Sequence, residues 1–313
     1  MLTFIGRRLF ATIPVMGMVA LFVFLMLRLT PADPAAIIAG DYATTEQIAE
    51  IRDKLGLNKA MHEQFFIWIG NVVQGDFGES FFFKKTVASL IAQRLEPTIA
   101  LAVVTIFLSV LIAVPMGVLA AWRQGTWIDR TVMGFSVAGF SVPVFVFGYA
   151  LIYVFSVKLG WLPVQGYVRI GEDFFAFLER MILPAITLSV IYIALIARIS
   201  RASVLEVLNE DYIRTARAKG LTNRVVLMKH ALRNAAVPIV TVIGIGIALL
   251  IGGVVVTESV YNIPGLGRLT VDAVTGRDYP TIQAVILLFS FAYVGINLVI
   301  DLIYTLLDPR IRY

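Results

Sequence analysis

The sequence contains no cysteine, only two histidines and few charged residues. The absence of cysteine excludes disulfide bonds, thiolate metal sites and thiol catalysis. Charged residues make up 15% of the chain, whereas about 25% is usual in soluble domains. Apolar residues make up 59%, and the mean hydropathy is +0.86. This composition is typical of a helical membrane protein.

Several motifs of catalytic and nucleotide-binding proteins are also missing. The chain has no G-x-x-x-x-G-K-[ST] phosphate loop, so it cannot bind and hydrolyse a nucleotide by that mechanism. Gly265 and Gly267 lack the third glycine of a dinucleotide-binding fingerprint, and we interpret them as part of a turn. The apolar segments described next carry few of the polar groups that an intramembrane enzyme needs. We therefore expect a non-catalytic chain with no cofactor and no metal site.

Six segments of the chain carry no charged residue, and each is close to the roughly 20 residues that cross a bilayer as a helix. They are residues 9–27, 97–122, 131–157, 181–197, 234–257 and 281–300. A soluble core would not contain six such runs, so we predict six transmembrane helices. The first run is longer than the apolar region of a signal peptide, which has roughly 7–15 residues, and we interpret it as a retained anchor.

The distribution of Lys and Arg sets the orientation of these helices. With the N-terminus in the cytoplasm, the inner segments are 1–8, 123–130, 198–233 and 308–313, and they hold 14 of the 26 basic residues. They are about half as long in total as the outer segments, so basic residues are about twice as dense inside, as the positive-inside rule requires. We therefore predict that both termini are cytoplasmic. His62 and His230 then lie on opposite sides of the membrane and cannot share a metal ion.

The outer segment between the first two spans is too long for a simple turn. Thr44 and Gln47 have the spacing of a capping box, and Ile48, Ile51 and Leu55 would follow on one face of a helix that ends at Gly56. Further amphipathic helices are expected over residues 62–73 and 86–95, the latter before Pro97 starts the second span. This insertion is either a small helical cap or a surface that contacts an external partner.

Small residues and a proline shape two of the spans. Gly244, Ala248 and Gly252 recur at every fourth position of the fifth span, which allows another helix to approach closely. Pro143 in the third span removes a backbone hydrogen bond and can kink the helix. Both features suit helices that repack during gating, and both also occur in ordinary multi-span packing.

A basic, helix-prone segment at residues 211–238 lies between two apolar spans. Its centre, residues 216–220, is predicted to be a short helix ended by Gly220. A helix–glycine–helix unit between two spans lies at the membrane surface, where it meets a partner or anionic lipid. A loop that only sets topology needs charge but not the arrangement of Ala216 and Gly220, so we favour a protein partner.

This segment resembles the ATPase-docking loop of ABC importer permeases, in the form found in dipeptide, oligopeptide and nickel permeases. The family's general pattern is Glu-Ala-Ala, three residues, Gly, nine residues and Ile-x-Leu-Pro. Ala216, Gly220 and Leu232 match this pattern, and Arg214, Thr215, His230 and Arg233 depart from it. The departures are those of the peptide branch.

Other segments along nearly the whole chain are similar to the same branch. They are the Gly-Arg-Arg-Leu at 6–9, the Gly-Asp-Phe-Gly at 75–78, the Leu-Gly-Trp-Leu-Pro at 159–163, the segment 262–269, the Arg-Asp-Tyr-Pro at 277–280 and the Asp-Pro at 308–309. The docking loop alone is a fairly specific signal, and the ordered set is highly specific.

The resemblance implies an all-α membrane protein with the type I ABC importer permease fold. The expected organisation is a first transmembrane helix at 1–30, a periplasmic helical insertion at 31–96, a transmembrane core at 97–307 with the docking loop at 198–233, and a cytoplasmic tail at 308–313. The residues expected to dock the ATPase are Asp211, Tyr212, Arg214, Thr215, Ala216, Arg217, Ala218, Lys219, Gly220 and Leu232. Those expected to act in gating or helix packing are Pro143, Gly244, Ala248 and Gly252.

The resemblance also implies partners. They are a second homologous permease, two cytoplasmic ATPase subunits that supply the energy, an external substrate-binding protein and the surrounding lipid; no nucleic acid is expected. Short peptides are the substrates implied, with nickel, glutathione-like and opine-like compounds left open. A self-sufficient secondary transporter and a signalling or scaffold protein are the alternative classes.

Overall fold

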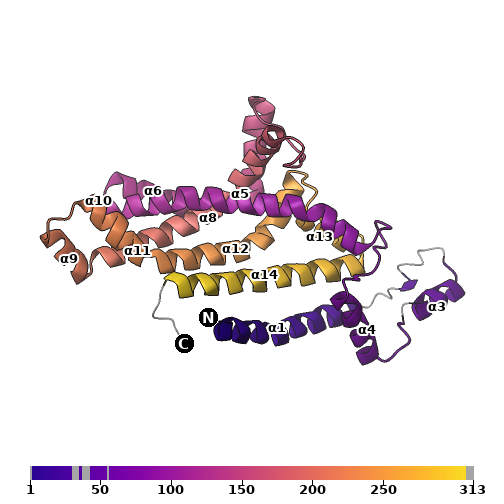
Figure 1. Cartoon of the computed structure of the whole chain (residues 1–313). Helices are drawn as coiled ribbons and strands as arrows, with labels where there is room; N and C mark the ends of the chain where they lie inside the picture. The colour runs from indigo at the N-terminus through magenta and orange to yellow at the C-terminus, as the bar shows by residue number, and fades with distance from the viewer. Residues whose placement is uncertain (1, 30–34, 37–42, 55, 308–313) are drawn as a thin grey trace. The chain divides into compact units, whose positions relative to one another are not determined.

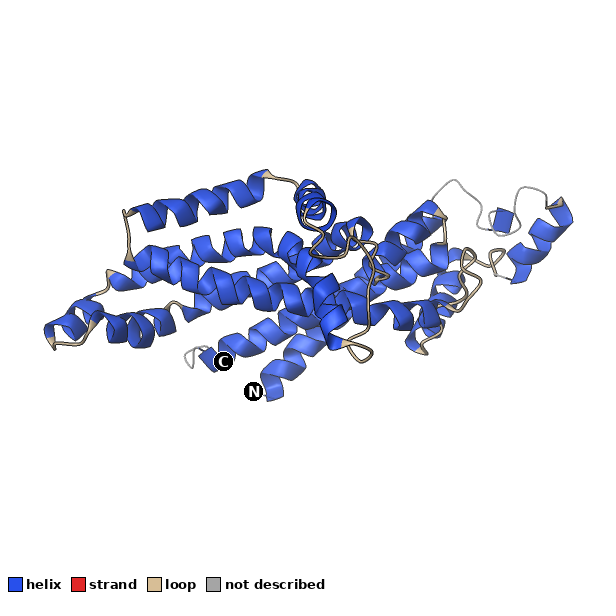
Figure 2. Ribbon diagram, turned by 90° about the horizontal axis from the view of Figure 1, so that it is seen from above, coloured by secondary structure: helices blue, strands red, loops and turns tan. Residues whose placement is uncertain are grey.

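The computed structural model describes residues 2–29, 35–36, 43–54 and 56–307. Among these residues the regular elements are helices, apart from a single bridge between Glu79 and Thr86 (Figure 2). The predicted all-α class is therefore confirmed. Leu55 and the expected cytoplasmic tail at 308–313 lie outside the described residues. The chain divides into two compact units, residues 1–95 with 268–295 and residues 96–267 with 296–313.

The first unit contains α1 (Leu2–Arg28), α3 (Thr45–Lys54) and α4 (Met61–Val73). It also contains most of α13 (Leu266–Thr275) and much of α14 (Tyr279–Leu307). Aromatic side chains join α1 to α4, because the ring of Phe24 lies 5.4 Å from that of Phe65 and 5.7 Å from that of Trp68. Such ring pairs contribute beyond the apolar area that they bury.

The predicted start of α3 is confirmed in detail. The backbone N–H of Thr44 donates to the side chain of Gln47 at 2.9 Å, and the N–H of Gln47 donates to the hydroxyl of Thr44 at 3.3 Å. This reciprocal pair satisfies two N–H groups that the first helical turn leaves without partners. The helix α4 begins one residue before the predicted 62 and ends at the predicted Val73.

One helix of the insertion was predicted wrongly. The stretch 86–95 was expected to end before Pro97, but α5 runs without a break from Val87 to Trp122 and includes Pro97 and Pro115. A proline removes only one hydrogen bond of the helical ladder, and neighbouring helices stabilise the remainder. The buried position of Pro97 fits this explanation, because its ring packs inside the protein.

The second unit is built around α8 (Phe174–Leu208), which contacts α6 (Trp127–Ser141), α7 (Val144–Leu151) and α12 (Ala236–Val260) (Figure 1). Its apolar core is centred on side chains of α8 that are almost fully buried, among them Leu188, Tyr192 and Ile196. A helix that buries side chains over most of its length is stabilised mainly by packing rather than by helix propensity. The α8 helix is therefore the scaffold on which the other helices of this unit are placed.

The third predicted span, residues 131–157, is not one continuous helix. The helix α6 ends at Ser141, and α7 begins after Pro143 and continues as a π-helical segment, Ile152–Lys158. The two parts are bent by 103°. Val142 is extended, with φ −98° and ψ 124°, because the ring of a following proline disfavours the helical conformation. Pro143 therefore produces a much sharper change of direction than the predicted kink.

Four helices of the described chain are long and apolar enough to cross a membrane, or five if the bent pair counts as one span. They are Val87–Trp122, Phe174–Leu208, Ala236–Val260 and Tyr279–Ile303. The helix α1 carries a shorter apolar stretch, Phe10–Met26. The multi-span character predicted from the sequence is thus confirmed, at four to five spans by length and composition.

Candidate functional site

The basic segment forms a helical turn at one end of the second unit. It consists of α9 (Asp211–Ala218), α10 (Asn223–Val225), a π-helical turn (Val226–Ala231) and α11 (Leu232–Asn234) (Figure 1). The helix–glycine–helix pattern predicted for this segment is present, and the second helical part is irregular.

One face of α9 is buried and anchors the helix. Ile213 is fully buried and Ala216 is 7% exposed, and both belong to an apolar cluster beneath α9. The other buried members of this cluster are Val118, Ala121, Val204, Val226, Leu227, Ala231, Ala235 and Ile239, and Leu232 packs against them. Burying apolar side chains stabilises by about 25 cal/mol per Å². The helix α9 is therefore fixed to α5, α8 and α12 through its underside.

The opposite face of α9 is exposed and charged. Arg214 donates to the carboxylate of Asp211 at 3.1 Å, and both side chains are mostly exposed, so this ion pair adds little stability. The hydroxyl of Tyr212 accepts a hydrogen bond of 3.0 Å from the amide of Asn234, which ties α9 to the end of α11. Thr215, Arg217, Ala218 and Lys219 complete the exposed surface.

Gly220 ends this helix in the conformation expected for it. Its φ is +81°, and its N–H donates to the carbonyl of Arg217 at 2.9 Å, while the N–H of Leu221 donates to that of Ala216 at 3.3 Å. These two bonds form a Schellman motif, in which glycine is favoured because it has no Cβ. A Cβ at Gly220 would meet no atom within 4 Å, so only the backbone conformation disfavours other residues.

The predicted docking residues thus separate into two groups. Ala216 lies on the buried face of α9, and Leu232 of α11 is half-buried against the same apolar cluster, so both support the helix. The other eight, from Asp211 to Gly220, lie together on the exposed side and its terminal turn. The two groups were not distinguished from the sequence, although Ile213 and Ala216 are three residues apart and so share one face of a helix.

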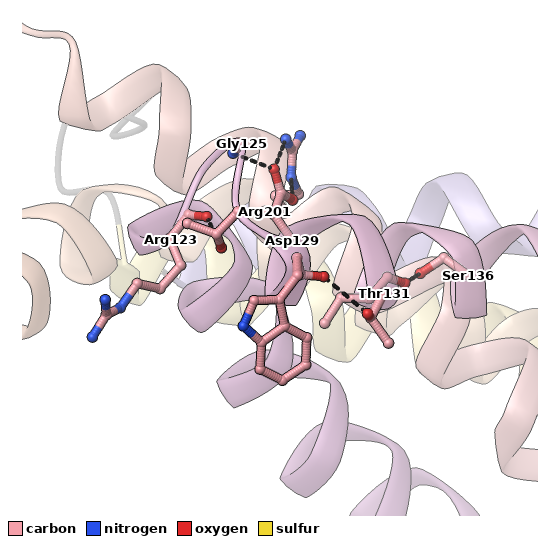
Figure 3. A network of polar contacts seen from close by, with 9 residues as sticks. Arg123, Gly125, Asp129, Thr131, Ser136 and Arg201 are labelled. Atoms are coloured by element: carbon pink, nitrogen blue, oxygen red, sulfur yellow. Dashed lines mark hydrogen bonds and ion pairs between the residues drawn. The ribbon is translucent and has the colours of Figure 1, made fainter.

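An ion pair near this segment was not singled out from the sequence. Arg201 of α8 binds the carboxylate of Asp129 in α6 through two nitrogens, with Nε–Oδ1 and Nη2–Oδ2 distances of 2.5 and 2.7 Å (Figure 3). The N–H of Gly125 donates to the same carboxylate at 3.0 Å. The sequence contains one indication of this pair: Asp129 is an acidic residue in the first turn of a helix, which is a favourable position for a negative charge, and it follows the turn at Gly125.

The residues proposed for gating do not form one interface within the chain. Gly244 is buried, and a Cβ there would collide with Ile300 of α14. Ala248 is half-buried, whereas Gly252 is exposed and has open space around it. Pro143 lies at the bend between α6 and α7, as described above.

Two glycines of α12 that were not predicted, Gly246 and Gly253, pack against Tyr192 and Leu188 of α8. The helix α12 therefore presents small residues to α8 and to α14, and it presents Gly252 to a side with open space. Close helix approach through small residues is typical of membrane proteins.

A fully buried carboxylate at the end of α12 was also not singled out. Glu258 is 0% exposed, and its Oε1 accepts a hydrogen bond of 2.6 Å from the hydroxyl of Thr98 in α5. The same hydroxyl accepts a hydrogen bond of 2.8 Å from the backbone N–H of Leu266. Glu258 also fills the space that a Cβ at Gly265 would need. The turn before α13 is therefore built on this carboxylate.

The described residues contain no group of three or more His, Cys, Asp or Glu side chains placed to hold a metal ion. Chemically, α9 offers an exposed, charged face above an apolar cluster that holds its other face. These features define a membrane protein with several apolar spans and a short, charged helix exposed at its surface.

The chain belongs to the family of binding-protein-dependent transport system inner membrane components. The family matches residues 113–313, and the N-terminal part characteristic of such membrane components matches residues 1–102. The fold is similar to a chain of the inward-facing MetNI methionine ABC transporter, with a TM-score of 0.59 and 22% identity. That comparison covers 70% of this chain and 96% of the other.

Curated relatives match over the full length. A "Probable peptide ABC transporter permease protein y4tP" of Sinorhizobium fredii is 57% identical over 310 residues, which cover 99% of each chain. The glutathione transport system permease protein GsiC of Escherichia coli strain K12 is 45% identical over 313 residues, which cover both chains completely.

These comparisons confirm the resemblance to the peptide branch of ABC importer permeases. The chain is the permease component of a binding-protein-dependent ABC importer in the inner membrane, a transport subunit and not an enzyme. Such an importer includes ATPase subunits and a substrate-binding protein, as expected from the sequence. A self-sufficient secondary transporter and a scaffold protein are excluded as classes.

Proposed function

We propose that this permease imports short peptides from an external binding protein into the cytoplasm by alternating access. One relative is named for peptide transport and another for glutathione, which is itself a short peptide, so both names point to the same substrate chemistry. A second, homologous permease forms the other half of the pathway. Nickel and opine-like compounds remain the competing substrates.

The proposed topology has six spans with both termini in the cytoplasm. The four long apolar helices, the bent pair α6–α7 and α1 supply these six spans. The higher density of Lys and Arg in the inner segments supports this orientation. Residues 1–30 form the first span, 31–96 the periplasmic insertion and 97–307 the core.

The observation that carries the proposal is the construction of α9. Its outer face is charged and exposed, and its inner face is held by Ile213 and Ala216 in an apolar cluster. We assign the outer face to contact with one ATPase subunit. Closure of the ATPases on ATP then displaces α9, and the buried anchors transmit this displacement to the spans. The bend at Pro143 and the small face of α12 at Gly244, Ala248 and Gly252 are the places where helices repack.

Reconstituted transport tests this function. The permease, its partner permease, the ATPases and the binding protein are assembled in proteoliposomes, and uptake of labelled dipeptide, glutathione and Ni²⁺ is measured with ATP and with a non-hydrolysable analogue. We expect ATP-dependent uptake of dipeptide or glutathione. Uptake of Ni²⁺ alone, or uptake without the ATPases, would contradict the proposal.

A further inference from the structure

The carboxylate of Asp129 is one of the few buried charges in the second unit. Its residue is 4% exposed and lies in the first turn of α6. Both oxygens are used, because Arg201 binds them in a two-pronged arrangement and the N–H of Gly125 donates to Oδ2 as well. Gly125 lies in the turn between α5 and α6, with φ +77°. One carboxylate therefore joins the α5–α6 turn to α8 (Figure 3).

Arg201 occupies a point where three helices meet. A Cβ at Gly117 of α5 would lie 2.6 Å from the carbonyl oxygen of Ala197 and 3.0 Å from the backbone nitrogen of Arg201, so α5 lies directly against α8 here. The start of α6 is attached through Asp129. Arg201 is also close along the chain to Val204, which packs in the cluster that holds Ile213 of α9. Arg201 therefore attaches the start of α6 to α8 three residues before Val204, which packs in the cluster beneath α9.

The chemistry of this pair favours positioning over stability. Replacing a buried ion pair by apolar side chains of similar size often leaves stability unchanged or increases it, so burial alone does not explain the pair. A planar guanidinium bound through two nitrogens fixes both the distance and the relative orientation of the groups it joins. An apolar contact at the same place would be non-directional and would not fix the relative orientation of the two groups in this way.

We propose that the Asp129–Arg201 pair is a coupling strut that transmits displacement of α9 through α8 to α6. The inference rests on the proposed docking of the ATPase at α9. When α9 and α8 move, the strut carries the start of α6 with them and so moves the segment that leads to the bend at Pro143. Without it, the ATPases drive α8 while α6 lags, and ATP is hydrolysed without transport. Asp129 and Arg201 are thus positioning residues that contact neither ATP nor substrate.

The test compares ATP hydrolysis with peptide uptake in the reconstituted complex. Arg201→Lys keeps the positive charge and removes the bidentate hydrogen bonding of the guanidinium. Asp129→Asn keeps the shape of the side chain and removes its negative charge. The double variant Asp129→Asn/Arg201→Gln leaves no unpaired charge and is expected to fold. In each we expect ATPases to remain bound and the number of ATP molecules hydrolysed per peptide to rise roughly three- to thirtyfold. The double variant should hydrolyse no more ATP per peptide than the single variants do, because all three variants break the same interaction.

Arg169→Gln is the matched control. Arg169 forms an ion pair of 3.6 Å with Glu96 in the same unit, but both side chains are substantially exposed and lie outside the proposed coupling path. This variant should keep the wild-type ratio of ATP to peptide. An unchanged ratio in Arg201→Lys and in the double variant would overturn the strut, as would an equal rise in Arg169→Gln. Failure of the double variant to accumulate as folded protein would show a purely structural role and overturn it too.

These outcomes are separate from failure of the proposed function. If the wild-type assembly imports no peptide, or if the ATPases bind without α9, then the substrate or the docking assignment is wrong. If the wild type imports peptide at a normal ratio and the variants do so as well, only the strut is wrong.

Discussion

The hydroxyl of Ser80 donates a hydrogen bond of 2.5 Å to the carboxylate of Asp278, which lies 198 residues further along the chain. Asp278 is fully buried, and it also accepts hydrogen bonds from the hydroxyl of Thr281 and from the N–H of Phe81. The loop after the Gly-Asp-Phe-Gly segment is thereby attached to the Arg-Asp-Tyr-Pro segment at the start of α14. One of the motifs that carry the family resemblance is thus bound to the loop that directly follows another, within the first unit.

Loss of this carboxylate should release the loop. Asp278→Asn removes the charge that three donors share, and hydrogen bonds to charged groups contribute about 1.5–3 kcal/mol each. We expect trypsin to cleave after Lys84 and Lys85, which are exposed in this loop, at least about tenfold faster than in the wild type. The measurement is the rate of appearance of the cleaved fragments.

Asp272→Asn serves as the control for that experiment. Asp272 forms a longer ion pair of 3.6 Å with Arg94 and is partly exposed, so its loss should change the cleavage rate little. Equal cleavage rates in the wild type and in Asp278→Asn would show that the carboxylate does not hold the loop.

The capping box at Thr44 and the Schellman motif at Gly220 were predictable from the sequence, because each depends on residues within a few positions of one another. The contact of Ser80 with Asp278 was not, because a single sequence does not say which distant segments meet. The pairing of Asp129 with Arg201 could not be predicted for the same reason. Pro143 indicated a kink, but the 103° change of direction also depends on the extended Val142 and on the packing of α7.

A hydroxyl of α5 should stabilise the turn before α13. Thr98→Val keeps the shape of the side chain and removes the hydroxyl that joins Glu258 to the N–H of Leu266. We expect the purified protein to lose about 1–3 kcal/mol of stability, measured as a lower melting temperature in detergent. Thr98→Ser retains the hydroxyl and should stay much closer to the wild type. The same melting temperature for Thr98→Val and the wild type would rule out this role.

The backbone at Gly220 should govern binding of the ATPase. Gly220→Val forces a β-branched residue into φ +81°, which disfavours the terminal turn of α9 by roughly 1–2 kcal/mol. We expect weaker co-purification of the ATPases and loss of uptake, while the permease still inserts in the membrane. Because no atom lies within 4 Å of a Cβ here, Gly220→Asn, which tolerates this conformation, should retain most of the binding.

Arg224→Gln is the comparison for this series, since Arg224 lies in α10 and outside the docking helix. It should affect co-purification less than Gly220→Val does. Normal uptake and normal ATPase binding in Gly220→Val would show that α9 is not the docking element.

The proposed orientation in the membrane, with both termini in the cytoplasm, rests on the count of basic residues. A reporter that is active only in the cytoplasm should be active when fused after Tyr313 and silent when inserted near Tyr42, two positions outside the described residues. Activity is measured in whole cells and normalised to the amount of fusion protein. A reporter that is active near Tyr42 would overturn the six-span topology with both termini inside.

The small face of α12 should matter for transport at its middle position. Ala248 is half-buried. Of its two neighbours on this face, Gly244 packs on Ile300 and Gly252 faces open space. A helix of the partner permease placed against that open side would approach closely, and a larger side chain would separate the two backbones. We expect Ala248→Leu to reduce uptake strongly, while the membrane level and ATPase binding persist.

Ile245→Leu provides the control, because Ile245 is 51% exposed on the same helix and the change conserves its volume. On a surface that faces lipid, Ala248→Leu would be as harmless as this control, since leucine is favourable in hydrocarbon. Wild-type uptake by Ala248→Leu would therefore place the face against lipid and remove it from gating. Loss of the protein from the membrane would instead show that the face serves static packing, because a gating defect leaves the folded protein in place.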